Sequence, residues 1–314
     1  MRIVTAEQLR AALPWAALEQ ALEAMFRQGC AAPLRHRHPL PQPGDEAEGM
    51  LLLMPAWTGP ASAGGFTGVK IVHVLPANGA RGLPAVQAVY LLSDGATGVP
   101  LAMLDGGELT DRRTAAASTL AGRYLARPDS RRLLVMGAGR VATTLAEAWC
   151  GRFPIEDVAI WARKPDQAEA LARRLAAHGL PARVASSPDP GGFDIVSCAT
   201  LSDAPLVRGA EISPGTHVDL VGAFRPTMRE SDGALLARAT VVADTRAGVL
   251  AEAGDVVQAI AEGAITEAAV VADLEALTRG AHPGRTRPDE VTLFKSVGWA
   301  GEDLAAAILA YQAG

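Results

Sequence analysis

The most informative short pattern is a run of small residues that follows an apolar stretch. The segment 133–142 reads Leu-Leu-Val-Met-Gly-Ala-Gly-Arg-Val-Ala and so has the spacing G-x-G-x-x-A. In such a loop the first glycine permits a tight turn, the second lets a pyrophosphate approach the backbone, and the alanine lets the helix pack closely on the strand. The first N–H groups of the helix then bind the phosphates. We therefore predict a dinucleotide site formed by Gly137, Ala138, Gly139, Arg140 and Val141.

The end of the next apolar run bears on which dinucleotide is bound. An NAD site usually carries Asp or Glu there, about 20 residues after the glycines, to hold the ribose 2′-hydroxyl. This chain has Arg163 and Lys164 after Trp161, and Asp157 stands at the beginning of the run. Two cations without a carboxylate suit a 2′-phosphate, because arginine offers a planar fork and lysine a point charge. We predict that NADPH is the preferred cofactor, with NADH as the alternative.

Lysine is rare in this chain and occurs only at Lys70, Lys164 and Lys295. Lys70 lies within an otherwise apolar run, 66–74, where an unpaired ammonium would be costly. A ligand or an acidic neighbour must therefore compensate its charge. His73 lies three residues further on and points to the opposite face of a strand, which makes it a weaker candidate for a proton donor.

Neither the histidines nor the cysteines form a convincing metal or disulfide pattern. His36 and His38 make an H-x-H pair with no evident acidic or cysteine partner. Cys30, Cys150 and Cys198 are far apart, and an odd count without C-x-x-C argues against a disulfide framework. We expect no metal site and reduced thiols, which fits a cytoplasmic protein.

Composition places the chain among ordinary globular proteins. It has 314 residues, of which 49% are apolar and 20% charged, and its net charge is −5. The length suggests two domains, and the charge provides no basic field for nucleic acid or an anionic membrane. No apolar run approaches the roughly 18 residues of a membrane span. The N-terminus begins a helix signal and does not resemble a signal peptide.

The first third of the chain predicts an α+β unit. Thr5 and Gln8 make a capping box, and a second helix, apolar on one face, ends near Gly29. Residues 31–48 are rich in Pro, His, Arg and Gly, which predicts a loop or an irregular edge. A hairpin is expected at Asp94, which is followed by glycine. The strands of an antiparallel or mixed sheet are expected in four apolar runs: 50–55, 66–74, 86–93 and 99–104.

After a helix expected at 107–126, apolar runs alternate with helical stretches. Such alternation predicts parallel βαβ units. Because the runs barely alternate polar with apolar residues, helices should cover both faces of the sheet. The fold class that we predict is α/β, a Rossmann doubly wound parallel sheet joined to the α+β unit, with a last amphipathic helix that places Leu304, Ile308 and Tyr311 on one stripe. The runs are 132–136, 157–161, 182–186, 194–200, 217–222 and 239–244, and the last helix is 299–313.

Seven motifs occur in a fixed order along the chain. They are Leu53-Met-Pro-Ala56, Gly68-Val-Lys70, Gly82-Leu-Pro84, Leu109-Thr-Asp-Arg-Arg-Thr-Ala-Ala116, the Gly137 loop, Pro214-Gly-Thr-His217 and Asp289-Glu-Val-Thr-Leu-Phe-Lys-Ser-Val-Gly298. Together they resemble the ornithine cyclodeaminase/μ-crystallin family across nearly the whole chain. The resemblance implies a substrate-binding and dimerisation domain over 1–123 and 297–314, a Rossmann domain over 124–296, and a homodimer.

The resemblance also implies which side chains bind the substrate. In the family two arginines and a lysine hold its carboxylate, and they match Arg35, Arg113 and Lys70. Arginine supplies the bidentate donors that a planar carboxylate needs. Arg37 stays an alternative to Arg35, because the spacing within this Pro-rich stretch is open. Arg112, next to Arg113 on the predicted helix, faces a different way.

Two departures from the cyclodeaminase pattern point to a reductase. Cyclodeaminases carry a catalytic aspartate after the fifth Rossmann strand and a glutamate two residues before their Met-Pro, and here Phe224 and Leu52 occupy those positions. A cyclodeaminase must manage ammonia release and attack by the distal amine, and these replacements remove both carboxylates that would assist these steps. The segments 83–87 and 221–224 are similar instead to bacterial Δ1-pyrroline-2-carboxylate and Δ1-piperideine-2-carboxylate reductases. Phe224 would then pack against the ring methylenes of the substrate.

We therefore predict an NAD(P)H-dependent oxidoreductase that reduces a cyclic ketimine carboxylate to L-proline or L-pipecolate, with Thr114 and Thr200 among the cofactor contacts. Lys70, a bound water or an already protonated imine could supply the proton. The alternatives are an alanine-dehydrogenase-like or N-alkyl amino acid dehydrogenase, an ornithine cyclodeaminase, and a non-catalytic NADPH-binding protein. The intact set of Arg35, Lys70 and Arg113 argues against the last. Ring size stays open, because one methylene is worth only about 1–3 kcal/mol in an apolar pocket.

Overall fold

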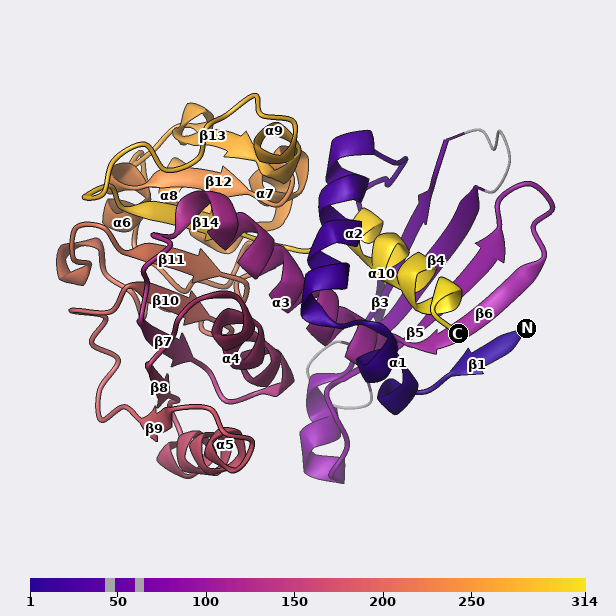
Figure 1. Ribbon diagram of the computed structural model, residues 1–314, viewed down its shortest axis with the longest axis horizontal. Coiled ribbons are helices and arrows are strands. Elements are labelled where there is room, and N and C mark those ends of the chain that lie inside the picture. Colours follow the sequence, from indigo (N-terminus) through magenta and orange to yellow (C-terminus); the bar gives the residue numbers. More distant parts are fainter. Residues whose placement is uncertain (43–48, 60–64) are drawn as a thin grey trace. The chain divides into compact units, whose positions relative to one another are not determined.

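The computed structural model describes residues 1–42, 49–59 and 65–314. It divides the chain into two compact units (Figure 1). Unit 1 comprises Met1–Arg113 and Trp299–Gly314, and unit 2 comprises Thr114–Gly298. The first boundary lies inside the long helix α3, Gly106–Leu125. Within the described ranges no helix is both long and apolar enough to cross a membrane.

Unit 1 is built on a six-stranded sheet with the order β1-β6-β5-β4-β3-β2. The pairing is antiparallel throughout, except that β1 runs parallel to β6. All four predicted apolar runs are strands of this sheet, so the prediction of an antiparallel or mixed sheet is confirmed. The strands are β1 (Arg2–Val4), β2 (His36–Leu40), β3 (Gly49–Trp57), β4 (Phe66–Val74), β5 (Val86–Asp94) and β6 (Pro100–Asp105).

Two strands of this sheet, β1 and β2, were not predicted from the sequence. The stretch 31–48 was expected to be a loop or an irregular edge, but β2 pairs with β3 over five residues. As an edge strand β2 is held by main-chain hydrogen bonds on one side, so its exposed Pro- and His-rich sequence shows no alternation. The part 43–48 lies outside the described residues. The capping box of Thr5 and Gln8 is confirmed, yet the three residues of β1 before it form a strand too short to show a period.

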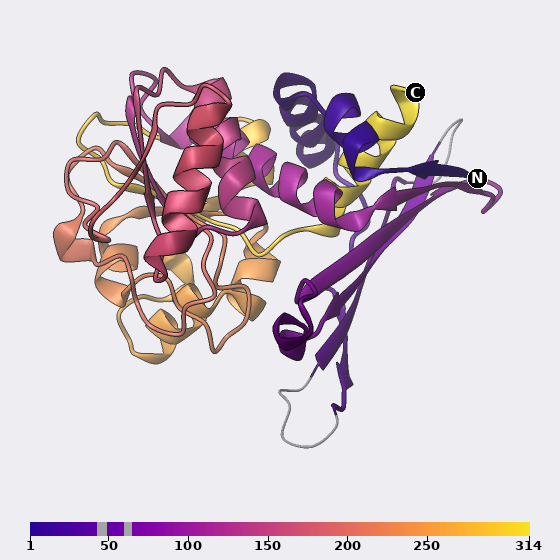
Figure 2. The same ribbon diagram turned by 90° about the horizontal axis from the view of Figure 1, so that it is seen from below.

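The helices of unit 1 pack on one face of the sheet and on each other. The last helix, α10, contacts β3, β4 and β5, and α2 packs on α10 through a ring stack of Phe26 on Trp299 (Figure 2). The predicted stripe of α10 is wrong: Leu304 is buried, but Ile308 and Tyr311 are only half-buried, and the whole stretch 300–307 is buried. A helix enclosed by a sheet and another helix has no solvent face, and its many alanines let both neighbours approach. The helices are α1 (Ala6–Ala12), α2 (Trp15–Gln28) and α10 (Ala300–Gln312), with the 3₁₀ helix η1 (Pro76–Arg81).

Unit 2 carries an eight-stranded parallel sheet with the order β13-β12-β14-β11-β10-β7-β8-β9. The chain leaves β7 toward β8 on one side and returns to β10 on the other, as in a doubly wound fold, and the predicted fold class is confirmed. Two strands, β13 and β14, were not predicted, because their pairing with β12 is decided by the folded sheet and not by a local pattern. The strands are β7 (Arg132–Met136), β8 (Asp157–Trp161), β9 (Ala182–Val184), β10 (Ile195–Cys198), β11 (His217–Leu220), β12 (Thr240–Ala243), β13 (Val270–Asp273) and β14 (Thr292–Lys295).

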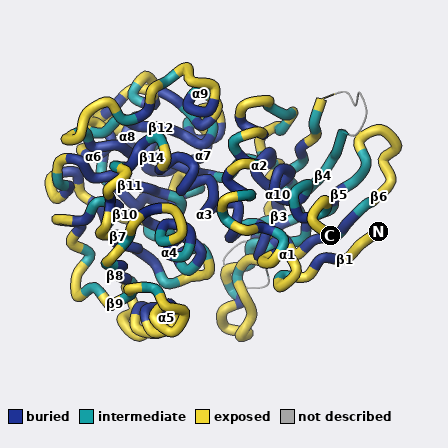
Figure 3. The backbone as a smooth tube through the Cα atoms, viewed as in Figure 1, coloured by how far each residue is buried: buried dark blue, intermediate teal, exposed yellow. Residues whose placement is uncertain are grey.

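Helices lie on both sides of this sheet, and every residue of β10 and β11 is buried (Figures 2 and 3). This is the two-sided cover that the unbroken apolar runs predicted. The helices of unit 2, after the second part of α3, are α4 (Arg140–Arg152), α5 (Pro165–Ala177), α6 (Gly233–Arg238), α7 (Arg246–Glu252), α8 (Gly254–Ala261) and α9 (Leu274–Thr278), with the 3₁₀ helices η2 (Gly209–Glu211) and η3 (Glu267–Ala269).

A buried carboxyl group lies in the middle of this sheet. Asp219 of β11 accepts hydrogen bonds from Ser197 Oγ of β10 at 2.6 Å and from Ser118 Oγ of α3 at 2.9 Å. Burial raises the pKa of Asp219 to about 7, although both hydroxyls lower it. Asp219 therefore links β11 to β10 and to α3, and its burial there disfavours the charged form of the carboxyl group.

The raised pKa of Asp219 predicts a stability that depends on pH. Between about pH 4 and 7 the unfolded carboxyl ionises while the folded one resists, so the native state loses stability as the pH rises. An Asp219→Asn side chain is neutral at every pH and can still meet both hydroxyls. We expect its melting temperature, relative to the wild type, to increase from about pH 5 to about pH 8. Exposed Asp203→Asn is the control, and an Asp219→Asn difference that is flat with pH would contradict the argument.

Candidate active site

In unit 1 a buried lysine is paired with a buried aspartate. Lys70 of β4 is 2% exposed, and its Nζ lies 2.8 Å from Oδ1 and 2.7 Å from Oδ2 of Asp303 on α10. On the sheet Lys70 stands between Met54 of β3 and Tyr90 of β5, both buried on the face that α10 covers. The acidic neighbour that the sequence required for Lys70 is therefore Asp303, which the sequence did not identify.

The same aspartate also binds the predicted arginine. Arg113 donates from Nε to Asp303 Oδ1 at 2.9 Å and from Nη1 to Glu302 Oε2 at 2.6 Å. Asp303 thus bridges Lys70 and Arg113. The half-buried Arg35 lies near enough for its charge to lower the pKa of Lys70. Lys70, Arg113 and Arg35 thus bring three cationic groups together, a donor set that suits a carboxylate ligand.

Burial lowers the pKa of Lys70 to about 8, with Arg113 and Arg35 acting in the same direction and Asp303 opposing them. Near neutral pH the side chain is therefore largely protonated, yet its proton is more easily given up than that of an ordinary lysine. A buried ammonium of this kind can act as a general acid.

The other polar side chains considered from the sequence lie elsewhere in unit 1. Arg112 faces away from Arg113, as predicted: its Nη2 donates to the Leu13 carbonyl at 2.6 Å, and its guanidinium stacks 4.1 Å from the Trp15 ring centroid. His73 is exposed and lies on the opposite face of β4 from Lys70, also as predicted. His36, His38 and Arg37 lie along the exposed strand β2. Over the described ranges no group of three or more His, Cys, Asp or Glu could hold a metal ion.

In unit 2 the glycine loop joins β7 to α4 and has room for a phosphate. Gly137 has φ +125°, and a Cβ there would lie 2.6 Å from the Ala199 carbonyl oxygen, so only glycine fits. Gly139 is the N-cap of α4, and a Cβ there would meet nothing within 4 Å. Ala142 is fully buried, as close helix packing requires. No side chain caps α4, so its first N–H groups suit the pyrophosphate of a dinucleotide.

The remaining candidates of unit 2 follow the carboxyl ends of neighbouring strands. Arg163 and Lys164 follow β8 and are exposed, Thr200 follows β10, and Phe224 follows β11. Because β8, β7, β10 and β11 are adjacent and parallel, these residues share one edge of the sheet with the glycine loop. Asp157 belongs to the opposite edge, as predicted, where Arg183 binds it through two hydrogen bonds. Thr114 lies on α3 and is buried.

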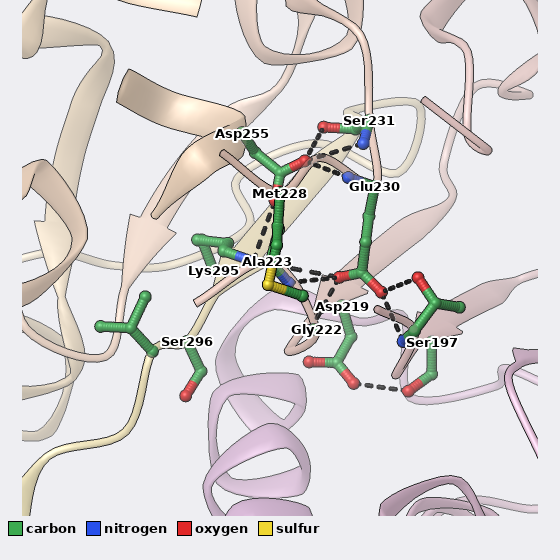
Figure 4. Close-up of polar contacts among 12 residues, drawn as sticks. Ser197, Asp219, Gly222, Ala223, Met228, Glu230, Ser231, Asp255, Lys295 and Ser296 are labelled. Atoms are coloured by element: carbon green, nitrogen blue, oxygen red, sulfur yellow. Dashed lines mark hydrogen bonds and ion pairs between the residues drawn. The ribbon is translucent and has the colours of Figure 1, made fainter. Parts of the chain in front are cut away.

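A buried glutamate holds the strand ends on which two of these candidates stand (Figure 4). Glu230 Oε1 accepts from Thr200 N at 2.7 Å and from Thr200 Oγ1 at 2.8 Å. Its Oε2 accepts from Gly222 N at 2.7 Å and from Ala223 N at 3.3 Å, just before Phe224. One carboxylate therefore fixes the backbone beyond both β10 and β11.

Glu230 belongs to a longer buried network. Its own backbone N donates to Asp255 Oδ1 at 2.7 Å, and Asp255 Oδ2 lies 2.9 Å from Lys295 Nζ at the end of β14 (Figure 4). Glu230, Asp255 and Lys295 are all fully buried. Sequence reasoning gave no role to these three residues, nor to Glu302 and Asp303. The signal used for Lys70, a charge inside an apolar run, also marks Lys295.

Comparisons with known proteins identify the class. The model of the ornithine cyclodeaminase/mu-crystallin family matches residues 3–313, so the chain belongs to this family. The chain is similar to a Delta(1)-pyrroline-2-carboxylate reductase of Paracoccus denitrificans, with 45% identity over 242 residues, which is 76% of each chain. The family prediction is confirmed, and so is the prediction of an oxidoreductase.

Solved structures agree over the full length. The Delta(1)-pyrroline-2-carboxylate reductase of Thermococcus litoralis, solved in complex with NADH and L-proline, superimposes with a TM-score of 0.93 at 33% identity and covers 100% of this chain and 97% of its own. An archaeal alanine dehydrogenase dimer with bound NAD superimposes with a TM-score of 0.89 at 28% identity, and the match covers 100% of this chain and 95% of its own.

The Glu230 network predicts a variant with impaired cofactor binding. Glu230→Gln keeps the shape but turns one acceptor oxygen into an N–H donor that faces the donors of Thr200 or Gly222. We expect NADH to bind roughly tenfold more weakly, a difference of about 1.4 kcal/mol, because the backbone beyond β10 and β11 loses its fixed position. Fluorescence titration with NADH measures the affinity, and melting reports the fold. The control is Glu262→Gln, an exposed partner of Arg229, and equal affinities in the two folded variants would refute the role of Glu230.

Proposed function

We propose that the protein reduces a cyclic ketimine carboxylate with NAD(P)H. The substrate is Δ1-pyrroline-2-carboxylate, Δ1-piperideine-2-carboxylate or both, and the product is L-proline or L-pipecolate. The observation that carries the proposal is the buried cluster of Lys70, Arg113 and Asp303, whose cationic donors, with Arg35 nearby, suit a carboxylate ligand. The similarity to two pyrroline-2-carboxylate reductases supports it.

Each residue has a defined task in this reaction. Arg113 and Arg35 hold the carboxylate, and Lys70, which also contacts it, donates a proton to the imine nitrogen and regains one from solvent. Gly137, Ala138, Gly139, Arg140 and Val141, with Thr114 and Thr200, would hold NAD(P)H, which when bound would supply the hydride for C2. The proton and the hydride together convert the C=N bond into a secondary amine. Positioning accounts for most of the rate enhancement in this scheme.

The replaced carboxylates favour reduction over cyclodeamination. Leu52 is buried on the covered face of β3, where it cannot hold a distal amine. Phe224 is half-buried and packs against the core of unit 2, and in our proposal its ring contacts the substrate methylenes. A second candidate is an alanine-dehydrogenase-like reaction, which the similarity to the archaeal alanine dehydrogenase favours.

A substrate screen tests the proposal. Oxidation of NADPH and NADH is followed with both cyclic imines, with pyruvate plus ammonia or methylamine, and without substrate, while ammonia release is measured from ornithine. We expect the highest kcat/KM with a cyclic imine. Faster turnover of pyruvate with an amine would favour the second candidate, ammonia release would favour a cyclodeaminase, and no turnover would favour a binding protein.

Arg113 provides the sharpest test of the substrate site. We expect Arg113→Ala to lower kcat/KM for the imine by on the order of 10²-fold, a loss of about 2.7 kcal/mol, while NADPH affinity stays nearly unchanged. Arg113→Lys should also impair turnover, because lysine cannot reproduce the planar fork. Steady-state kinetics and NADPH fluorescence measure the two effects. If Arg113→Ala lost cofactor binding but kept its affinity for the imine, Arg113 would belong to the cofactor site and not to the substrate site.

Arg163 and Lys164 carry the proposed preference for NADPH. Both are exposed beyond β8, where a 2′-phosphate is bound in doubly wound folds. Replacing both by alanine should raise KM for NADPH far more than KM for NADH. Arg173→Ala, an exposed arginine on α5, is the control. Equal changes in KM for both cofactors would show that Arg163 and Lys164 do not bind the 2′-phosphate.

We also propose a cytoplasmic homodimer formed through unit 1, with unit 1 as the substrate-binding and dimerisation part and unit 2 as the cofactor-binding part. The face of the sheet opposite α10 carries apolar side chains that are half-buried, or exposed in the case of Ile3, which is unusual for a monomer. A second copy of the chain suits such a face, and the alanine dehydrogenase relative is a dimer. The cross-strand register places these residues side by side on that face: Ile3, Leu53, Pro55, Val69, Ile71, Val89, Leu91 and Met103.

A charge on this face should separate the copies. Ile71 pairs with Leu53 and Val89 across the strands, so Ile71→Glu places a carboxylate among apolar neighbours. We expect a dimer for the wild type and a monomer for Ile71→Glu at micromolar concentration in sedimentation. Val271→Glu, at an exposed apolar position of β13, should remain a dimer. A monomeric wild type would contradict the proposal.

A further inference from the structure

Asp303 lies in the first turn of α10 and is fully buried, yet it accepts from two cations at once. Both of its oxygens lie within 2.8 Å of Lys70 Nζ, and Oδ1 also accepts from Arg113 Nε at 2.9 Å. Burial by itself would favour the neutral acid, but the two cations hold the pKa of Asp303 below its usual value. The carboxylate therefore stays charged and remains a counter-ion for Lys70.

The other groups that face Lys70 do not replace this counter-ion. Arg113 from α3 and Arg35 from the segment before β2 both lower the pKa of Lys70 by repulsion. Tyr90 of β5 is buried beside it on the sheet, and burial holds the pKa of its hydroxyl well above the ordinary value, so it adds no charge near neutral pH. Glu302 is bonded to Arg113. Without Asp303, the ammonium would face two cations in a buried setting and would tend to lose its proton.

We propose that Asp303 is a positioning residue that keeps the Lys70 ammonium charged and aims it, so that Lys70 can protonate the imine nitrogen. This inference rests on the proposed function, in which Lys70 is the acid. It gives α10, from the C-terminal end of the chain, a part in catalysis without contact between Asp303 and the substrate.

If Lys70 is the acid, the rate of imine reduction depends on pH in one direction. A general acid works in its protonated form, so imine reduction falls as the pH rises through the pKa of Lys70, about 8. Removing the Asp303 charge removes the interaction that raises this pKa. The falling limb of kcat/KM should therefore move to lower pH in Asp303→Asn, by about one unit or more.

The test combines kinetics with a direct titration. The pH profile of kcat/KM is measured for wild type, Asp303→Asn, Asp303→Glu, Glu302→Gln and Lys70→Arg. Because the chain has only three lysines, 13Cε-lysine NMR of the cofactor-free protein gives three signals, and Lys70→Arg identifies that of Lys70. We expect the limb and the Lys70 titration to move down together in Asp303→Asn and to return toward wild type in Asp303→Glu. Glu302→Gln should raise KM and leave the limb in place.

The results distinguish the role of Lys70 as the acid from the role of Asp303 as its positioning residue. If a limb of the wild-type profile persists unchanged in Lys70→Arg, it belongs to the substrate, and Lys70 is not the acid of the proposed function. If the limb disappears in Lys70→Arg but neither limb nor NMR titration moves in Asp303→Asn, the role of Asp303 is overturned. Should Asp303→Asn not fold, Asp303→Ser decides: it also removes the carboxylate charge, so a limb and a Lys70 titration both unchanged from wild type would overturn the proposal.

Discussion

The buried ion pair between Lys70 and Asp303 is the constraint on which unit 1 depends. An ammonium inside an apolar sheet is stable only with a counter-charge at bonding distance, and Asp303 supplies it at 2.7 Å. That requirement explains why the last helix returns to the first sheet and why its first turn is acidic although it is buried on all sides. The same carboxylate binds Arg113, so the two cations that we propose for substrate binding are held in place by Asp303.

Unit 2 also contains a fully buried lysine, Lys295, whose charge is balanced by buried carboxylates. Lys295 is balanced by Asp255, Asp255 anchors the backbone of Glu230, and Glu230 binds the strand ends near Thr200 and Phe224. Such networks add little net stability, because desolvation offsets the attraction. The contribution of this network is positional, because Glu230 ties the backbone beyond β10 and β11 together.

Solved structures similar to this chain are named for several reactions, and in our proposal two of its positions, Leu52 and Phe224, bear on the choice among them. A cyclic imine arrives with its ring closed, so its reduction needs a held carboxylate, a proton and a hydride. In our proposal Arg35, Arg113 and Lys70, together with the cofactor, meet that smaller demand. The apolar Leu52 and Phe224 stand where ammonia release and amine attack would need carboxylates, which is why we favour reduction over cyclodeamination.

The sequence by itself determined the parallel sheet, the glycine loop, the family and the need for a partner to Lys70, because periodicity, small residues and an isolated charge are local signals. Only the tertiary structure decided the partners. Asp303 lies 233 positions from Lys70, and no local pattern links them. The strands β2 and β14 and the burial of α10 were missed for the same reason: edge pairing, insertion between β11 and β12, and enclosure by a sheet are properties of neighbours brought together by folding.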